Sequence, residues 1–247
     1  MNSPIYSDII LLILAFFYVL FILGIAMILK KLSIISSHTA RKIVHTFAGF
    51  AIFIVPYMNI PHLALTVSIL FLIVCRTSKP NNPVFEMMAE KDERQLGYLG
   101  GPFYYSLAIN ILVFIFAFEP LIKYYYFPAN SIMIMMISDS IAAFIGQKFG
   151  KHKIKLNWTK TIRTLEGSFS LFISAFLLSV FGFSFFGVWF PIQINVLHFY
   201  NIIILSFIVS ISATIIELLS PSNLDDLTVP IFSCLISLSF AFQLHLI

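Results

Sequence analysis

The run IILLILAFFYVLFILGIAMIL, from Ile9 to Leu29, contains no acidic or basic side chain over its 21 residues. A helix that crosses a bilayer needs about 20 mainly apolar residues. No A-x-A-like cleavage site follows this run, so we expect a transmembrane span rather than a removed secretory signal. The rest of the chain agrees with a membrane location.

Composition supports the same class of protein. Of the 247 residues, 60% are hydrophobic and 11% are charged, and the mean hydropathy is +0.97. Soluble domains carry about 25% charged residues. We therefore expect one all-α integral membrane domain over residues 1–247, surrounded by membrane lipids and without a nucleic-acid partner. The two cysteines, Cys75 and Cys234, are expected to be apolar fillers.

Apolar runs recur along the whole chain and predict a polytopic bundle of about eight transmembrane helices (seven to eight). They lie at 9–29, 43–58, 61–75, 99–118, 129–147, 165–190, 199–219 and 227–247. The second and third runs are short and flank Pro56 and Pro61. They are either two thin spans or one re-entrant pair.

Basic residues gather in alternate linkers. With eight spans, linkers 30–42, 76–98, 148–164 and 220–226 fall on one side and hold 14 of the 15 Lys and Arg residues, Lys123 being the exception. The positive-inside rule makes this side cytoplasmic. Both chain termini are then predicted on the opposite side.

Asp139 is an acid inside a predicted span. Placing an ionisable group inside a bilayer has a high free-energy cost, and such groups are often functional. Asp139 precedes Lys148 by nine residues, about 13 Å along a helix. Ala142, Gly146 and Gly150 share its helix face, which predicts a groove where a bulky group can approach. The alternatives are a buried, hydrogen-bonded carboxyl and small-residue helix packing.

Three further groups of polar residues lie at the cytoplasmic ends of spans. Glu166, Gly167 and Ser168 open a span after Arg163, and a helix start of this kind can bind phosphate. Glu217 lies near the end of a span. Asp225 and Asp226 follow it, and clustered carboxylates suit Mg²⁺, although a solvated acidic turn is the alternative.

Arg41, Lys42 and His45 open the second run, with Arg41 and His45 on one helix face. A purely structural histidine is the alternative there. The chain shows no catalytic triad, P-loop, cysteine-based metal site or GxGxxG motif, and the residues at 146–151 do not form a Walker A motif.

Together these blocks resemble the phytol, dolichol and polyprenol kinase family of integral membrane enzymes. Residues 41–45 look like RKxxH, residues 99–105 like L-G-G-P-x-x-Y, and 139–150 like D-x-x-A-x-x-x-G-x-x-x-G. Residues 163–168 resemble K-[TS]-x-E-G-S, and 213–230 resemble A-T-x-x-E followed by D-N-[LF]-x-[VI]-P. Arg163 stands where the family usually has Lys, and Asp226 where it has Asn.

The resemblance implies a kinase that uses CTP or another nucleoside triphosphate, with Mg²⁺ or a similar cation, on a lipid alcohol. Positions that match the motifs, together with nearby charges, are expected to share the work of phosphoryl transfer. Asp139 is the first candidate for base, His45 the second, and Glu166 supports the site. Asp139, Glu217, Asp225 and Asp226 are the expected metal ligands. Phosphate and nucleotide are expected at Arg41, Lys42, Gly146, Gly150, Lys160, Arg163 and Ser168.

Two other functions stay open at this point. A cytidylyltransferase acting on phosphatidate or a prenyl phosphate would also use CTP and Mg²⁺, but the long K-D-x-x-x-x-x-P-G-H-G-G-type signature is absent. An ion-coupled transporter would use Asp139 as an ion site, but the acids gather at one face rather than along a path. Phytol, geranylgeraniol, longer polyprenols and diacylglycerol all remain possible acceptors, and the sequence leaves the oligomeric state open.

Overall fold

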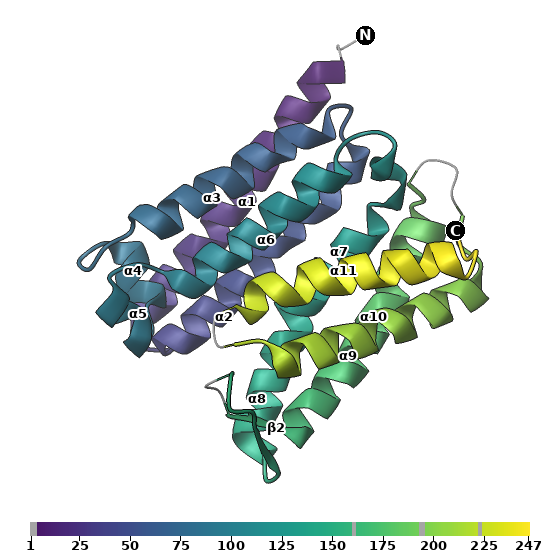
Figure 1. Cartoon of the computed structure of the whole chain (residues 1–247). Coiled ribbons are helices and arrows are strands. Elements are labelled where there is room, and N and C mark those ends of the chain that lie inside the picture. The colour runs from purple at the N-terminus through teal and green to yellow at the C-terminus, as the bar shows by residue number, and fades with distance from the viewer. Residues whose placement is uncertain (1–3, 160–161, 193–195, 222–223) are drawn as a thin grey trace. The chain divides into compact units, whose positions relative to one another are not determined.

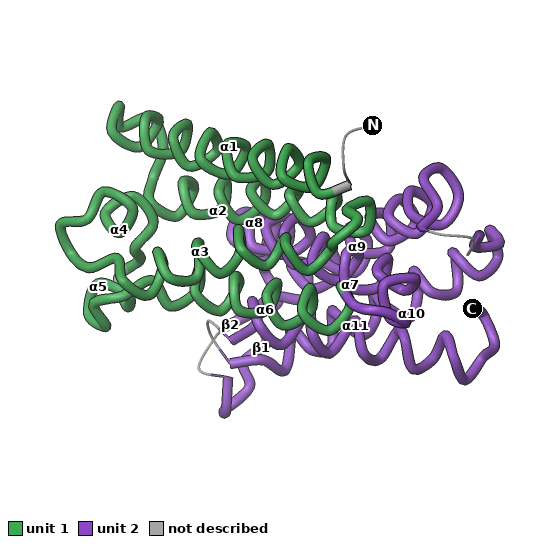
Figure 2. Tube along the Cα trace, turned by 90° about the horizontal axis from the view of Figure 1, so that it is seen from above, with its two compact units in different colours: residues 1–117 green, residues 118–247 purple. Residues whose placement is uncertain are grey.

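The computed structural model describes residues 4–159, 162–192, 196–221 and 224–247. Contacts divide the chain into two compact units, Met1–Ala117 and Phe118–Ile247 (Figure 2). Each unit is described by itself below. The expectation of a single domain over the whole chain stays a prediction.

All regular elements among the described residues of unit 1 are helical (Figure 1). Its elements are α1 (Pro4–Lys31), α2 (Ser37–Ala48), the 3₁₀ segments η1 (Gly49–Tyr57) and η2 (Pro61–Ala64), α3 (Leu65–Thr77), α4 (Pro83–Met88), α5 (Lys91–Leu96) and α6 (Gly100–Phe116).

Local sequence explains where two of these helices begin. The Ser36 side chain accepts a hydrogen bond from the Thr39 N–H and caps α2. Glu90 and Glu93 form a reciprocal capping box at the start of α5. Gly97 ends α5 with a φ of 74°, a left-handed conformation that glycine adopts without strain. These signals fix the start of α2 and both ends of α5.

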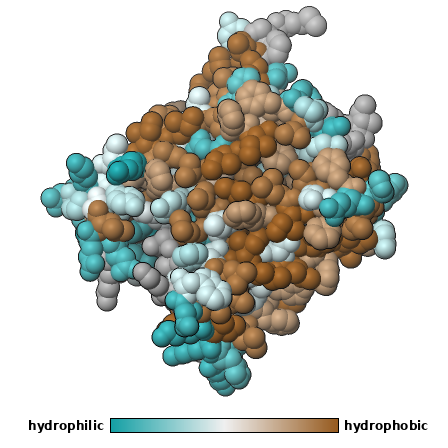
Figure 3. Space-filling view, viewed as in Figure 1, coloured by the Kyte–Doolittle hydropathy of each residue, from teal (hydrophilic) through white to brown (hydrophobic). Residues whose placement is uncertain are grey.

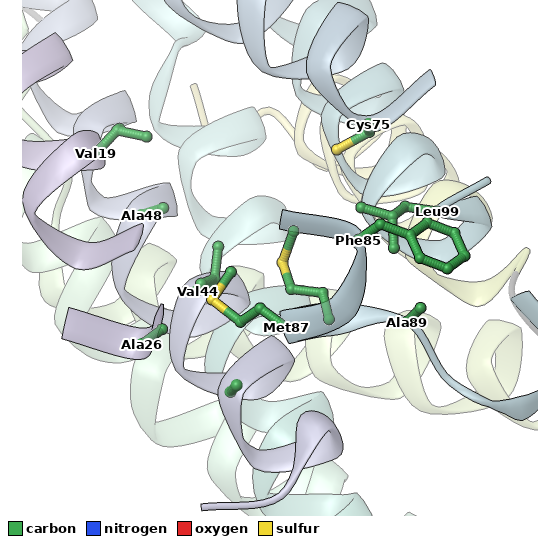
Figure 4. Packing of buried hydrophobic residues seen from close by; sticks show 11 residues of the cluster. Val19, Ala26, Val44, Ala48, Cys75, Phe85, Met87, Ala89 and Leu99 are labelled. Atoms are coloured by element: carbon green, nitrogen blue, oxygen red, sulfur yellow. The ribbon is translucent and has the colours of Figure 1, made fainter. Parts of the chain in front are cut away.

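The core of unit 1 gathers side chains from α1, α2, α3 and the segment around α4 (Figure 4). Val19 and Ala26 of α1 pack with Val44 and Ala48 of α2, and Phe85 of α4 is fully buried in the same cluster. Helix α3 packs against α6. The packing holds α2 and the first turn of α6 near Glu93 of α5.

Unit 2 consists of helices and one small hairpin. Its elements are the 3₁₀ segment η3 (Leu121–Tyr124), α7 (Tyr126–Met133), the π-helical segment η4 (Ile134–Ser138), α8 (Asp139–Phe149), β1 (Lys153–Lys155), β2 (Ile162–Thr164), α9 (Leu165–Ser184), the π-helical segment η5 (Phe185–Trp189), α10 (Phe199–Leu219) and α11 (Asp225–Gln243).

Helix α9 packs on α8 and α10, and α11 packs on α10 and α7. The π-helical turn η4 lies directly before Asp139 and makes α7, η4 and α8 one continuous rod. Such turns often occur at functional positions in helices.

The hairpin is a departure from the expected all-α fold. Strands β1 and β2 are antiparallel, with Ile154 opposite Arg163. Lys-Ile-Lys and Ile-Arg-Thr alternate polar and apolar residues, which suits a two-stranded ribbon. From the sequence, only the charges of this linker were interpreted, so the hairpin was not expected. The hairpin ends in the cap of α9, where the Thr164 hydroxyl accepts a hydrogen bond from the Gly167 N–H.

Apolar side chains cover much of the surface, as the helices of a membrane protein require. Figure 3 shows them along the helices, while hydrophilic side chains gather around α4 and α5 and around the hairpin. Among the described residues, five helices are long and apolar enough to cross a membrane, and Pro61–Thr77 and Gly100–Phe116 are shorter. An integral membrane protein agrees with these helices, but the count of eight spans is not confirmed.

Candidate active site

Four carboxylates of unit 2 line one small cavity. Asp139 comes from the start of α8, Glu217 from the end of α10, and Asp225 and Asp226 from the first turn of α11. The sequence singled out these four acids separately, in three different segments. The fold brings them to a common cavity whose other walls are apolar.

The Arg163 guanidinium lies among these carboxylates. Its Nη1 forms an ion pair with Glu217 Oε1, and its Nη2 lies 3.3 Å from Asp225 Oδ2. The same Nη2 donates to the Ser220 carbonyl at 3.1 Å. Because like charges repel strongly where water is scarce, a cation here stabilises the group of acids.

The hairpin holds Arg163 in this position. Arg163 belongs to β2, and the Trp158 indole N–H donates to the Leu219 carbonyl at the end of α10, at 3.3 Å. The hairpin is thereby attached to the helix end that carries Glu217. The basic linker expected from the sequence thus contributes Arg163 to the acids at the ends of α10 and α11.

The side chains around the cavity are of the type that binds Mg²⁺, but they are not arranged as the ligands of a bound ion. Oxygen ligands from carboxylates are those that Mg²⁺ prefers. Glu217 Oε2 is buried and has no hydrogen-bond partner among the described residues. In the same part of the chain, no three His, Cys, Asp or Glu side chains are close enough to hold an ion. A cation fits the donor set if the acids approach one another and Arg163 gives up its contacts with them.

Glu166 makes other contacts. Its carboxylate accepts the His152 backbone N–H at 3.2 Å and is joined to the His152 ring Nδ1 at 2.8 Å. These bonds tie the first turn of α9 to the residue before β1. Glu166 is not among the residues that line the acidic cavity, so its expected supporting role remains a prediction.

Gly146 and Gly150 lie where α8 meets the start of α9. A Cβ added at Gly146 would lie 2.9 Å from Thr164 Oγ1, and one at Gly150 would overlap the Thr164 side chain. Gly167 approaches Ala142 in the same contact. Close helix packing therefore accounts for both glycines, and nucleotide binding by them stays a prediction.

Ser168 and Lys160, on either side of Arg163 in the sequence, were also expected to contact phosphate. Ser168 Oγ is buried without a hydrogen-bond partner among the described residues, so it has the capacity to bind a ligand. Lys160 lies outside the described residues.

Unit 1 holds a second polar cluster around Arg41. Arg41 Nη1 lies 3.1 Å from Glu93 Oε2 and 3.7 Å from Glu90 Oε1, and Glu93 is 1% exposed. Glu93 Oε1 accepts the Gly101 N–H at 2.8 Å. Arg41 thereby connects α2 to α5, and Glu93 connects α5 to α6.

The Gly-Gly-Pro turn at the start of α6 fits around this ion pair. A Cβ at Gly101 would overlap the Arg41 guanidinium, and one at Gly100 would meet Glu93 Oε1 at 3.8 Å. The glycine at 101 is required because the guanidinium passes directly over its backbone. The L-G-G-P block thus serves a buried Arg–Glu pair in this structure.

Glu90 is the more accessible acid of this cluster, and its environment favours the charged form. A hydrogen bond from His38, at 2.9 Å, lowers the pKa of Glu90 most, and the charge of Arg41 lowers it further against the opposing effect of burial. Lys42 is half-buried and contributes to the same lowering of the Glu90 pKa. Lys42 therefore lies close to the acids that already hold Arg41.

His45 lies one helical turn beyond Arg41 and is 5% exposed. Its ring packs on the Tyr105 ring, with 4.1 Å between centroids, and the Tyr105 hydroxyl donates to the His45 carbonyl at 2.9 Å. These contacts fix the ring against α6. They suit a structural histidine, and its role as a base stays a prediction.

Sequence reasoning missed Glu90, Glu93 and His38. Glu90 and Glu93 carry the Glu-x-x-Glu spacing of a capping box, which was the available signal. It also missed Asp8, whose carboxylate accepts the Asn59 and Ile60 backbone N–H groups at 2.9 and 2.7 Å. Asp8 fixes the turn between η1 and η2, far in sequence from the acidic cavity.

The fold and these clusters define a class of protein. It is a helical protein with apolar helices long enough to cross a membrane and a site of carboxylates paired with an arginine. Comparison with known proteins finds two relatives. The chain is 27% identical over 214 residues to a phytol kinase of Synechocystis, covering 86% of this chain and 83% of the relative. It is 24% identical over 230 residues to a probable chloroplastic phytol kinase of Triticum aestivum, covering 85% of this chain and 69% of the relative.

These relatives confirm the predicted resemblance to the phytol kinase family, and the chain is a phytol kinase-like enzyme. No protein-family model matches the chain, and no solved structure matches it. The arrangement of the site therefore comes from this structure alone.

Proposed function

We propose that this protein transfers the γ-phosphoryl group of a nucleoside triphosphate, CTP in first place, to an isoprenoid or other lipid alcohol at the cytoplasmic face of a membrane. The observation that carries the proposal is the cavity in which Asp139, Glu217, Asp225 and Asp226 meet Arg163. Carboxylates for a metal and a guanidinium for phosphate are the parts that phosphoryl transfer requires.

The reaction is a displacement at phosphorus. The alcohol oxygen forms a bond to the γ-phosphorus, the bond from that phosphorus to the β-γ bridging oxygen breaks, and the nucleoside diphosphate leaves. The alcohol proton passes to a base, for which Asp139 is the first candidate and His45 the second. One relative is a phytol kinase of Synechocystis, and this favours an isoprenoid alcohol as acceptor.

A divalent cation would be held by Glu217, Asp225, Asp226 and Asp139, some of them through water, since Mg²⁺ keeps several waters. When bound, it neutralises charge on the phosphate oxygens. Arg163 then exchanges its carboxylate partners for phosphate oxygens, to which a guanidinium can donate two parallel hydrogen bonds.

Arg41 receives a different assignment from the one its sequence suggested. Its guanidinium is engaged by Glu93 and Glu90 inside unit 1. We assign it to positioning α2 against α5 and α6, and leave phosphate contact to Lys42, Lys160 and Arg163. The preference for CTP rests on the family resemblance, and the cytoplasmic face rests on the distribution of basic residues.

The test uses purified protein in detergent with γ-labelled CTP, ATP or UTP and a panel of lipid alcohols that includes phytol, geranylgeraniol, a polyprenol and diacylglycerol. We expect label on an isoprenoid alcohol, and its loss in a Glu217→Gln variant. Asp92→Asn, which changes an exposed acid of α5, is the matched control and keeps activity.

Other outcomes separate the competing functions. Transfer of a cytidylyl group to a lipid phosphate, with no phosphate transfer to any alcohol, identifies a cytidylyltransferase. Solute uptake by proteoliposomes without either transfer identifies a transporter. Both results contradict the kinase proposal.

A further inference from the structure

An apolar cavity in unit 1 has no charged side chain on its wall. It lies among α1, η1, α3 and α6, and its wall runs from Leu12 on α1 to Val113 on α6. We infer that this cavity binds the hydrocarbon tail of the alcohol substrate, a single isoprenoid chain, with the hydroxyl end at Tyr105. This inference rests on the proposed function for the identity of the occupant.

The wall of the cavity excludes a charged or strongly polar ligand. Of the 17 lining residues, Ser68, Tyr105 and Ser106 alone carry polar side chains. Each hydroxyl already donates to the protein: Ser68 to the Leu65 carbonyl at 3.2 Å, Tyr105 to the His45 carbonyl at 2.9 Å, and Ser106 to the Pro102 carbonyl at 2.8 Å. With its donors engaged and no charge on its wall, the cavity is suited to a hydrocarbon.

Small residues shape the wall. Alanine or glycine lines it at positions 15, 48, 49, 51 and 64, and branched Ile and Val side chains lie between them. Such a wall leaves recesses at several levels, into which the methyl branches of an isoprenoid can fit. A straight, unbranched chain would leave these recesses empty and lose contact energy there.

The orientation of the bound isoprenoid chain follows from residues of α2. Arg41, His45 and Ala48 are spaced i, i+4 and i+7, so they share one helix face. Ala48 lines the cavity, and His45 stacks on Tyr105 at its end. One face of α2 therefore leads from the charged cluster, past a histidine, into the apolar wall. This order matches an amphipathic alcohol with its hydroxyl at His45 and its tail beyond.

The wall of the cavity is long enough to contact the beginning of a long tail. Along α6, Tyr105 and Val113 are separated by about 12 Å at a rise of 1.5 Å per residue. We expect the isoprene units next to the hydroxyl to lie in the cavity and the rest to extend beyond it. Chain length should therefore affect binding less than branching near the hydroxyl does.

The experiment uses purified full-length protein in detergent and a geranylgeraniol analogue that carries a photoreactive diazirine near its hydroxyl end. After illumination, labelled peptides are mapped by mass spectrometry. Ala15→Phe places a ring into the cavity, while Leu14→Phe makes the neighbouring change at a side chain that is 60% exposed and does not line the cavity. Val67→Phe and Ile69→Phe form a second matched pair on α3, should Ala15→Phe fail to fold.

We expect label on peptides of α1, α3 or α6 in the wild type. We expect a loss of labelling of about tenfold in the folded cavity variant and none in its control, since even small misfits in apolar pockets cost this much. In the kinase assay, the same variant raises the KM for geranylgeraniol while the KM for the nucleotide stays unchanged.

Label confined to unit 2, or equal labelling of wild-type and cavity variants, overturns the tail site. Failure of the kinase proposal has a different signature. In that case no alcohol is phosphorylated, yet photolabelling of the cavity and its block by Ala15→Phe or Val67→Phe persist. The two inferences are therefore tested separately by the same preparations.

Discussion

Arg163 of strand β2 pairs with Glu217 at the end of α10, and the same guanidinium reaches Asp225 at the start of α11. The arginine thus acts as the counter-ion of the acidic cavity. A divalent cation would compete with it for the same oxygens. This competition gives Arg163 a measurable effect on metal affinity that a simple phosphate ligand would lack.

Arg163→Ala should therefore strengthen the binding of Mn²⁺ or Mg²⁺ in the absence of nucleotide, because a competing positive charge is removed. We expect a dissociation constant lower by about tenfold, or ~1.4 kcal/mol. The same variant should raise the nucleotide KM, while Arg163→Lys, the residue usual in the family, keeps substantial activity. Mn²⁺ binding by electron paramagnetic resonance and steady-state kinetics measure the two effects.

Lys153→Ala is the control for this prediction, since it removes an exposed base from the partner strand β1. It should alter neither quantity. Unchanged metal affinity in Arg163→Ala contradicts the counter-ion role, and an unchanged nucleotide KM contradicts the phosphate role.

Gly101→Ala should destabilise unit 1, because the added methyl overlaps the Arg41 guanidinium that Glu93 holds. Arg41→Ala should do the same by leaving Glu93 buried without its partner, at a cost of about 3–5 kcal/mol. Thermal unfolding in detergent measures both. Gly24→Ala is the matched control, because nothing lies within 4 Å of a Cβ there. Equal melting temperatures for Gly101→Ala and Gly24→Ala would refute the close approach.

The environment of Glu90 predicts how the stability of the protein changes at acidic pH. Its pKa is lowered, first by the His38 hydrogen bond and then by Arg41. Its ionised form therefore stabilises the fold fully above the ordinary glutamate pKa of about 4.3, and this contribution is lost as the pH falls through the lower folded-state pKa. Glu90→Gln should remove this part of the acid-induced loss of stability.

His38→Ala tests the same linkage from the other partner. Without the His38 hydrogen bond, the folded-state pKa of Glu90 should rise towards its unfolded-state value, so the acid-induced loss of stability due to Glu90 should be smaller and should be complete at a higher pH than in the wild type. Thermal unfolding as a function of pH compares the three proteins. Identical pH profiles for the wild type and Glu90→Gln would show that Glu90 does not contribute.

The parts of the fold that follow from apolar runs were predictable, because a span has a strong local signal. Ile9–Leu29 lies within α1, and the runs at 165–190 and 199–219 coincide with α9–η5 and α10. The hairpin and the helices α4 and α5 were not predicted, because short elements in charged linkers have weak local preferences. The capping box of Glu90 and Glu93 was readable but was not used.

For the site too, the parts with a signal in the sequence were predictable and the parts that depend on the folded structure were not. The acids of unit 2 were found from their cost in a membrane and from a family resemblance, and the fold places them around one cavity. The pairing of Arg163 with Glu217 could not be read from sequence, because it depends on where the hairpin folds. Gly146 and Gly150 had two readings, and their approach to Thr164 and Gly167 supports close packing.

The positive-inside argument predicts that the linkers at 30–42, 76–98 and 148–164 face the same side of the membrane. Single cysteines at Lys79 and Lys153, both exposed positions, should therefore react with an impermeant maleimide from one side only. The native Cys75 and Cys234 are buried and serve as the background control. Labelling from opposite sides would show that the pair of short runs at 43–75 was miscounted.

Asp139→Asn is the decisive substitution for the acidic cavity. Asp139 follows the π-helical turn η4 and lines the cavity with Glu217, Asp225 and Asp226. The change nearly keeps the shape and the hydrogen-bonding capacity of the side chain, so a purely structural carboxyl should tolerate it. A metal ligand or a base depends on the negative charge. We expect a loss of about a thousandfold in kcat, or ~4 kcal/mol.

The measurement is phosphate transfer to a lipid alcohol in detergent, with size-exclusion behaviour as the control for folding. Asp92→Asn makes the same chemical change at an exposed side chain of α5 and should leave the rate unaltered. If Asp139→Asn elutes normally and keeps more than about a tenth of the wild-type rate, a loss below ~1.4 kcal/mol, Asp139 does not take part in the reaction. The metal site would then have to consist of Glu217, Asp225 and Asp226, with the base sought at His45.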